Sequence, residues 1–185
     1  PVETAIKAIV VRSANDVAVV IAEALGGTEK HFAEMMTEKA RQLGMTHTNF
    51  DNASGLPDKL QTTTDGDLAL LARHLAYDFA QYYPYFATKK FTFKGRLYQT
   101  HDNLIYAFRG TDGIKTGYTQ MSGFNLVTSA IRNDKHIIGV VMGGRTAASR
   151  DAEMIKLLTQ AFNRADKDPT LVAYANVPWE DGAGP

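Results

Sequence analysis

The sequence contains no cysteine, and this absence removes several kinds of chemistry at once. Without thiols the chain has no disulfide framework, no thiolate zinc site and no cysteine nucleophile. The redox compartment stays open, because cysteine-free proteins occur on either side of a membrane.

A charge excess and long apolar runs are also lacking. The 185 residues carry 20 Lys and Arg against 20 Asp and Glu, so the formal net charge is zero. A balanced chain is not expected to bind nucleic acid or a membrane surface through its charge. The apolar runs are only a few residues long, which is too short to span a bilayer. No signal peptide and no initiator Met begin the sequence, so we expect the chain to be the interior of a longer protein.

The spacing of apolar residues changes along the chain from a helical period to a strand period. Helical spacing predicts helices over residues 3–12, 17–25, 29–43, 67–77 and 148–162, and Thr28 is expected to cap the third of them. A further aromatic-rich helix is expected to end near residue 88, with a break at Pro84. Alternation predicts strands over residues 90–93, 96–99, 113–118, 124–132 and 136–142, the last two joined by a turn at Asn133-Asp134. This order indicates an α+β fold with an antiparallel sheet.

Two three-residue motifs stand out. Ser13-x-Asn15 lies between two apolar helices, and Lys115-Thr116-Gly117 lies on an expected edge strand before a hairpin. Ser-x-Asn and Lys-Thr-Gly are two of the three motifs of penicillin-binding proteins and class A β-lactamases, and the third is Ser-x-x-Lys. Either motif alone is weak, because such short patterns arise by chance in a chain of this length.

The flanking sequence adds the specificity that the motifs lack. Six stretches carry it, in this order: Val11–Asp16, Leu43–Phe50, Ser54–Leu56, Asp112–Thr119, Gly123–Val127 and Met142–Thr146. Over about residues 3–162 the chain resembles the D-alanyl-D-alanine carboxypeptidases, which are low-molecular-mass penicillin-binding proteins. The resemblance implies a β-lactamase-like D,D-peptidase fold, in which an antiparallel sheet with flanking helices carries a helical subdomain. It also implies acyl transfer from a cell-wall stem peptide to a serine, with release of D-alanine.

The third motif is missing, since no serine in the chain is followed three residues later by lysine. In the family that it resembles, this motif supplies the nucleophile and its lysine partner, and it would fall before Pro1. We therefore expect residues 1–163 to be the second part of the catalytic domain, without its N-terminal strands and nucleophile helix. Residues 164–185 are predicted to be a linker or tail. This piece alone is expected to be inactive.

The resemblance implies catalytic roles for three residues. Ser13 would relay a proton to the leaving amine, although a serine at this place is also typical of a helix N-cap. Asn15 would hold the amide of the substrate. Alternatively, Asn15 is simply a residue that starts a helix at a turn. Lys115 would supply positive charge to the site, although a single strand lysine is usually solvated.

Other residues would bind the substrate. The Thr116 hydroxyl would contact the terminal carboxylate, Gly117 would let the substrate approach the strand, and the backbone N–H of Tyr118 would form half of the oxyanion hole. One of two arginines would pair with the carboxylate, and the family pattern favours Arg150 over Arg145. Alternatively, Arg145 only braces the corner between strand and helix.

The five histidines have no ligand spacing and are expected to be surface or packing residues, so no metal and no cofactor are expected. The implied partners are peptidoglycan stem peptides, β-lactam antibiotics and the missing N-terminal part of the same domain, in a periplasmic or otherwise extracytoplasmic and possibly membrane-associated protein. Two alternatives stay open. One is a β-lactamase or D,D-endopeptidase of the same fold, and the other is a non-catalytic module that binds peptidoglycan or a protein partner.

Overall fold

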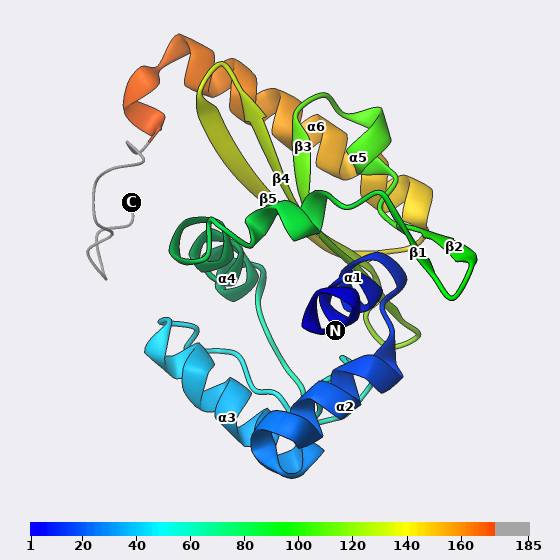
Figure 1. Ribbon diagram of the computed structural model, residues 1–185. Helices are drawn as coiled ribbons and strands as arrows, with labels where there is room; N and C mark the ends of the chain where they lie inside the picture. The colour runs from blue at the N-terminus through cyan, green and yellow to red at the C-terminus, as the bar shows by residue number, and fades with distance from the viewer. Residues whose placement is uncertain (173–185) are drawn as a thin grey trace.

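The computed structural model describes residues 1–172, in which helices surround one three-stranded sheet (Figure 1). The helices are α1 (Val2–Arg12), α2 (Asn15–Gly26), α3 (Glu29–Gln42), α4 (Asp65–Asp78), α5 (Leu104–Ala107) and α6 (Ala147–Lys167), with short 3-10 segments η1 (Tyr83–Ala87) and η2 (Pro169–Leu171). The strands are β1 (Lys90–Phe93), β2 (Arg96–Gln99), β3 (Thr111–Thr119), β4 (Gly123–Arg132) and β5 (Lys135–Gly144). The α+β class predicted from the sequence is confirmed.

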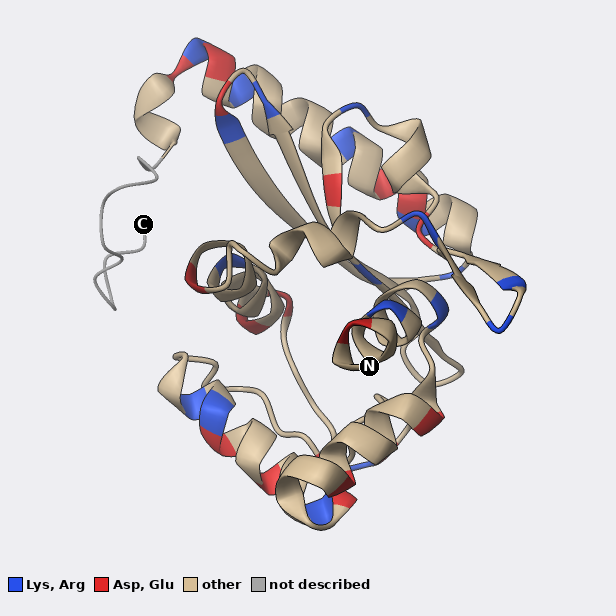
Figure 2. Cartoon of the chain, viewed as in Figure 1, with Lys and Arg blue, Asp and Glu red and all other residues tan. Residues whose placement is uncertain are grey.

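The main sheet is antiparallel in the order β3-β4-β5, and β1 and β2 form a separate hairpin. Asn133 and Asp134 both have positive φ, 50° and 59°, so the predicted tight turn between β4 and β5 is correct. Lys94 and Gly95 turn the small hairpin in the same way, with φ of 46° and 74°. Figure 2 shows that this hairpin carries basic residues and no acidic ones. The predicted alternation therefore located both hairpins.

The sheet has a core on each face. Helix α6 covers one face, where Leu126 and Ala130 of β4 pack with Met154, Leu158 and Phe162 of the helix. Helix α4 and η1 cover the other face, and this second core is made by Ala72, Ala76, Tyr83 and Ile114. Successive side chains of a strand point to opposite faces, so β4 supplies apolar residues to both cores.

Helices α2 and α3 form a helical subdomain that lies away from the sheet (Figure 1). Thr28 caps α3 as predicted, because its hydroxyl accepts the His31 backbone N–H at 3.1 Å. The long loop that follows α3 is fixed to the start of α4. The Thr48 hydroxyl and the His47 N–H both donate to Asp67 Oδ2, at 2.6 and 2.9 Å.

Two predicted helices differ from the structure. The aromatic-rich segment before residue 88 is only the 3-10 turn η1, because Pro84 lacks a backbone N–H and Tyr83 is anchored in the core. The Tyr83 hydroxyl contacts Ser129 Oγ on β4, and burial raises the pKa of Tyr83.

Helix α6 runs to Lys167, beyond the predicted end at 162, and the short helix α5 was not predicted. Ala165 is buried, which gives the last turn of α6 a packed side, but one alanine among charged residues carries no apolar signal. The expected linker or tail therefore begins with helix, and its part over residues 173–185 lies outside the described residues.

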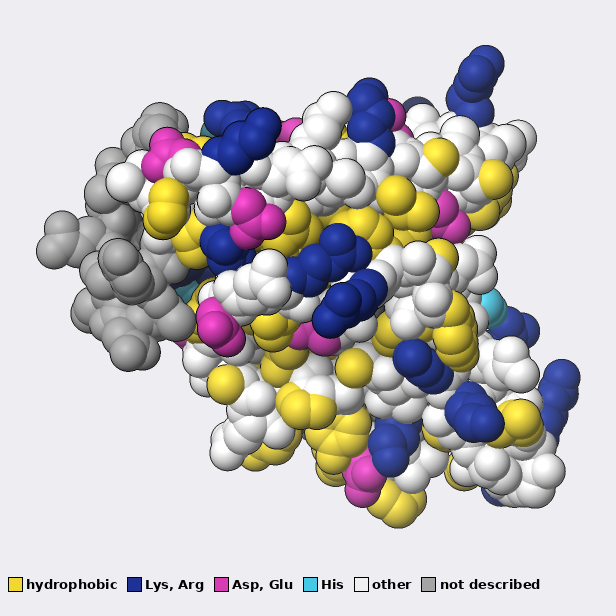
Figure 3. Space-filling view, turned by 90° about the horizontal axis from the view of Figure 1, so that it is seen from above, with side chains coloured by type: hydrophobic (Ala, Val, Ile, Leu, Met, Phe, Trp, Pro, Cys, Tyr) yellow, Lys and Arg dark blue, Asp and Glu magenta, His cyan; other side chains and the backbone are white. Residues whose placement is uncertain are grey.

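Charges of both signs are spread over the surface. Seen from above, Lys and Arg side chains lie beside acidic and apolar ones on the same face (Figure 3). Within residues 1–172 no helix combines the length and the apolar character that crossing a membrane requires.

Candidate active site

Ser13 follows the last residue of α1 and begins the turn that leads to α2. Its backbone is left-handed, with φ 54° and ψ 47°, which is uncommon for a residue other than glycine. The turn is closed by Ser13 N–H to the carbonyl of Ile9, 3.0 Å, and by Ala14 N–H to that of Ala8, 3.3 Å. Ser13 is thus a C-cap of α1, and the N-cap interpretation is wrong: Ala14 is the N-cap of α2, and no side chain bonds there.

Lys115 lies in the middle of β3 and reaches across to this turn. Its Nζ donates to Ser13 Oγ at 2.5 Å and to the Thr116 carbonyl at 2.7 Å. The contact joins residues 102 positions apart in the sequence, so the fold brings the two motifs together.

Burial changes the acidity of this lysine. It lowers the pKa of Lys115 from 10.5 to about 8, and the negative charge of Asp102 opposes the change. Asp102 is itself 6% exposed. Its Oδ1 accepts the Leu104 N–H at 2.9 Å, whereas its buried Oδ2 has no hydrogen-bond partner within residues 1–172. Burial raises the pKa of Asp102, and Asp151 acts in the same direction.

Two further basic residues, Arg12 and His101, lie near Lys115. Arg12, the last residue of α1, donates from Nη1 to Nε2 of His101 at 2.9 Å. Burial lowers the pKa of His101, and the charges of Arg12 and Lys115 lower it further, so the ring is neutral near pH 7. The lone pair on Nε2 of the neutral ring accepts the Arg12 N–H, which an imidazolium could not do.

These groups line a cleft of about 970 Å³ between the helical subdomain and the sheet. Its walls come from the turn between α1 and α2, a loop after α3, the edge strand β3 and the start of α6. Among the lining residues are Ile9, Arg12, Ser13, Asn15, Ser54, Leu56, Pro57, His101, Lys115, Thr116, Gly117, Tyr118, Phe124, Asn125 and Arg150.

The remaining motif residues lie along the same wall. Asn15 is the first residue of α2 and is exposed in the cleft. A Cβ added to Gly117 would meet no atom within 4 Å, so the strand presents bare backbone there. The side chain of Tyr118 is 61% exposed, and its ring lies 4.3 Å from that of Phe124.

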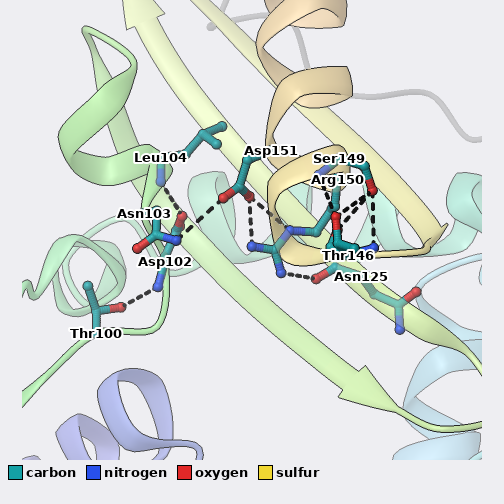
Figure 4. Close-up of polar contacts among 9 residues, drawn as sticks. All are labelled: Thr100, Asp102, Asn103, Leu104, Asn125, Thr146, Ser149, Arg150 and Asp151. Carbon is teal, nitrogen blue, oxygen red and sulfur yellow. Dashed lines mark hydrogen bonds and ion pairs between the residues drawn. The ribbon is translucent and has the colours of Figure 1, made fainter.

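The two candidate arginines occupy different places. Arg150 lines the cleft although it is only 3% exposed. Its Nε and Nη2 donate to Asp151 Oδ1 at 2.9 and 2.7 Å, and its Nη1 donates to the carbonyl of Asn125 at 3.3 Å (Figure 4). Arg145 is exposed and is not among the residues that line the cleft.

Sequence reasoning missed several polar residues of this site. His101 was interpreted as a surface or packing residue, and Asp102 and Asp151 were not considered. Each belongs to no motif, and the Arg12–His101 contact spans 89 positions, so only the fold reveals them. Within the described part of the chain, no group of three or more His, Cys, Asp or Glu side chains is arranged to hold a metal ion.

The chain is similar to known bacterial proteins. A family model described as D-alanyl-D-alanine carboxypeptidase matches residues 1–146. The chain is 36% identical over 163 residues to the D-alanyl-D-alanine carboxypeptidase DacA of Escherichia coli, a match that covers 88% of this chain and 40% of DacA. The chain thus spans less than half the length of that relative.

Solved structures show the same fold. The carboxypeptidase DacD of Francisella tularensis superposes with a TM-score of 0.83 at 30% identity, covering 87% of this chain and 52% of DacD. Penicillin-binding protein D2 of Listeria monocytogenes in its cefotaxime-bound form superposes with a TM-score of 0.78 at 30% identity, covering 84% of this chain and 64% of that one. The predicted D,D-peptidase fold is confirmed.

Proposed function

This chain belongs to the D-alanyl-D-alanine carboxypeptidase family, and we propose that the complete protein removes the terminal D-alanine from peptidoglycan stem peptides through an acyl-enzyme. A serine hydroxyl would give its proton to the lysine of its own Ser-x-x-Lys motif as its oxygen bonds to the carbonyl carbon between the two D-alanines, and the C–N bond would break. D-Alanine would leave as the amine after gaining one proton, and water would then hydrolyse the ester.

The contact between Lys115 and Ser13 is the observation that carries this proposal. Ser13 Oγ accepts from the Lys115 ammonium and keeps its own proton available for a second partner. It would pass that proton to the leaving amine and be reprotonated from Lys115. A buried, desolvated lysine held against a hydroxyl supports a role in proton transfer and favours an enzyme over a module that only binds.

Recognition of the substrate would use the rest of the cleft. Arg150 and the Thr116 hydroxyl would bind the free carboxylate, and a guanidinium in a partly dry site suits that anion. Asn15 would hydrogen-bond the substrate amide. Gly117 would admit the peptide to the strand edge, and the Tyr118 N–H would donate to the developing oxyanion.

The nucleophile would come from a segment outside these 185 residues. Three serines line the cleft, namely Ser13, Ser54 and Ser122, and none is followed three residues later by lysine. The Ser54 and Ser122 hydroxyls bond within their own loops, to Asn52 and Thr119 respectively. The missing part of the domain would supply a Ser-x-x-Lys motif, and its strands would pair along the outer edge of β5.

The same serine would be acylated by β-lactams, because their strained amide presents a carbonyl and a carboxylate as the peptide does. The cefotaxime-bound Listeria relative supports this step. A cell-wall substrate also implies that the protein works outside the cytoplasmic membrane.

Release of D-alanine tests the proposal. The complete protein should liberate D-alanine from an acyl-D-Ala-D-Ala peptide, and Lys115→Ala should lower the rate by about 100-fold or more because the site loses its proton donor and its charge. Lys90→Ala, which removes an exposed lysine of β1, is the matched control and should retain full activity. Near-normal turnover by Lys115→Ala would remove Lys115 from the site. Cleavage of a cross-linked peptide alone would instead identify a D,D-endopeptidase.

A further inference from the structure

The orientation of Arg150 is set by the elements that meet at the start of α6. The capping box of this helix fixes its first turn, with Ser149 N–H to Thr146 Oγ1 at 3.0 Å and Thr146 N–H to Ser149 Oγ at 3.1 Å. Arg150 follows directly. A Cβ added to Gly144 of β5 would lie 2.8 Å from Arg150 Cβ, so a glycine at 144 lets the helix approach the sheet this closely.

Asp151 occupies one side of the Arg150 guanidinium. A guanidinium has five N–H donors in a rigid planar fork. Nε and Nη2 donate to the same oxygen, Oδ1 of Asp151, and Nη1 donates to the Asn125 carbonyl. One N–H on each of Nη1 and Nη2 then has no partner within residues 1–172. A carboxylate binds two such donors side by side.

Asp151 is itself held from its other side. Its Oδ2 lies 3.5 Å from Nδ2 of Asn103, which belongs to the loop ahead of α5. Figure 4 shows Asp151 between Asn103 and Arg150, and only 14% of its side chain is exposed. The carboxylate is therefore held mainly by the two short hydrogen bonds at Oδ1, with a longer contact at Oδ2, and it can orient the guanidinium in turn.

From this geometry we propose that Asp151 is a positioning residue, which holds the Arg150 guanidinium in the orientation that binds the carboxylate of the substrate. This inference rests on the proposed function, because it takes the terminal carboxylate of a D-Ala-D-Ala peptide as the ligand. Asp151 does not touch the substrate. Without it, the buried cation loses its partner and its flexible side chain is no longer restricted to one rotamer.

A purely structural ion pair, which only attaches α6 to the sheet, is the competing explanation, and substrate discrimination separates the two. The complete protein is assayed with an acyl-D-Ala-D-Ala peptide and with the same peptide carrying a C-terminal amide. The readout is the ratio of kcat/KM for the acid to kcat/KM for the amide. Asp151→Asn should lower this ratio by about tenfold or more, mainly through a higher KM for the acid, since a charge-assisted contact is lost.

Three further variants make the test specific. Arg150→Ala sets the floor of the ratio, and adding Asp151→Asn to it should cause no further loss if Asp151 acts through Arg150. Asp151→Glu keeps the charge and should recover part of the ratio. Glu153→Gln removes an exposed carboxylate from the same helix and should leave the ratio unchanged.

A wild-type ratio in folded Asp151→Asn would overturn the inference, as would an equal loss on both peptides. If the wild-type protein hydrolyses neither peptide, the proposed function has failed. The affinities of the acid and the amide for wild type and Asp151→Asn then decide the positioning role. A preference for the acid that only the wild type shows supports it, and any other result contradicts it.

Discussion

Lys115 lowers the stability of the fold that holds it. Its folded pKa, about 8, lies below the 10.5 of an unfolded lysine, because burial disfavours the charged form. Below pH 8 the side chain is charged in both states, so the desolvation penalty is fully present. That penalty is on the order of a few kcal/mol. A residue that is kept at a cost in stability and that also contacts Ser13 fits the trade-off between stability and activity at functional sites.

Replacing Lys115 by methionine should therefore stabilise the complete protein while abolishing acylation. Urea unfolding at pH 7 should give a free energy of unfolding higher than wild type by on the order of 1–3 kcal/mol, and Lys90→Met should change it little. As the pH rises from about 8 to 10.5 the unfolded state binds more protons than the folded state, so wild-type stability rises. The gap between wild type and variant should close over this window. A gap independent of pH would contradict the account.

Single residues also mark what the sequence could predict and what it could not. The order and flanks of the motifs predicted that Ser13 and Lys115 belong to one site, and the structure places the two side chains in contact. Arg150 was favoured by the same pattern. Asp151 and His101 were not predicted, because Asp151 contacts Asn103, and His101 contacts Arg12, only across the fold. The left-handed backbone of Ser13 was not predicted either. The residues Ser-Ala-Asn are compatible with both a C-cap and an N-cap, so the sequence does not distinguish the two.

Among the strands of the main sheet, two glycines test how closely other groups can approach the sheet: Gly117 at the cleft and Gly144 beneath α6. Gly117 lies on the open wall of β3, where an added Cβ meets nothing within 4 Å. Gly144 lies under α6, where the same atom would lie 2.8 Å from Arg150 Cβ and 3.0 Å from the Phe124 carbonyl. Neither has a positive φ, so alanine fits both backbones and only the surroundings differ.

Gly144→Ala should destabilise the protein by about 1–3 kcal/mol, because the helix must move off the sheet. Gly117→Ala should leave the melting temperature unchanged but weaken peptide turnover, because its methyl group occupies the strand edge along which the substrate would lie. Thermal melting and D-alanine release measured on both variants check this. A stability loss at Gly117 equal to that at Gly144 would show that the cleft wall is not open.

The elements themselves were predicted wherever the pattern was long and regular. The two hairpins, the turn at Asn133-Asp134 and the helix capped by Thr28 follow from alternation, turn chemistry and capping. The prediction of a longer helix in the segment that contains Pro84 was wrong. Its aromatic residues indicated burial, but the structure satisfies burial with a single 3-10 turn.

At the level of the whole molecule, the cleft is lined by segments that lie far apart in the sequence, from Ile9 to Arg150. It takes the turn at Ser13, the loop at Ser54–Pro57, strand β3 and the start of α6. The sheet ends at β3 on the cleft side and at β5 on the other, as far as residues 1–172 show. The sequence predicted the antiparallel sheet but not the depth at which Lys115 and Arg150 lie, because burial depends on how distant elements pack.

We infer that this chain supplies the proton relay and the carboxylate site, while the acylated serine lies elsewhere in the complete protein. The most direct measurement is to label the complete protein with a fluorescent penicillin and map the adduct by mass spectrometry. We expect one adduct, on the serine of a Ser-x-x-Lys motif outside these 185 residues. An adduct on Ser13, Ser54 or Ser122 would contradict it.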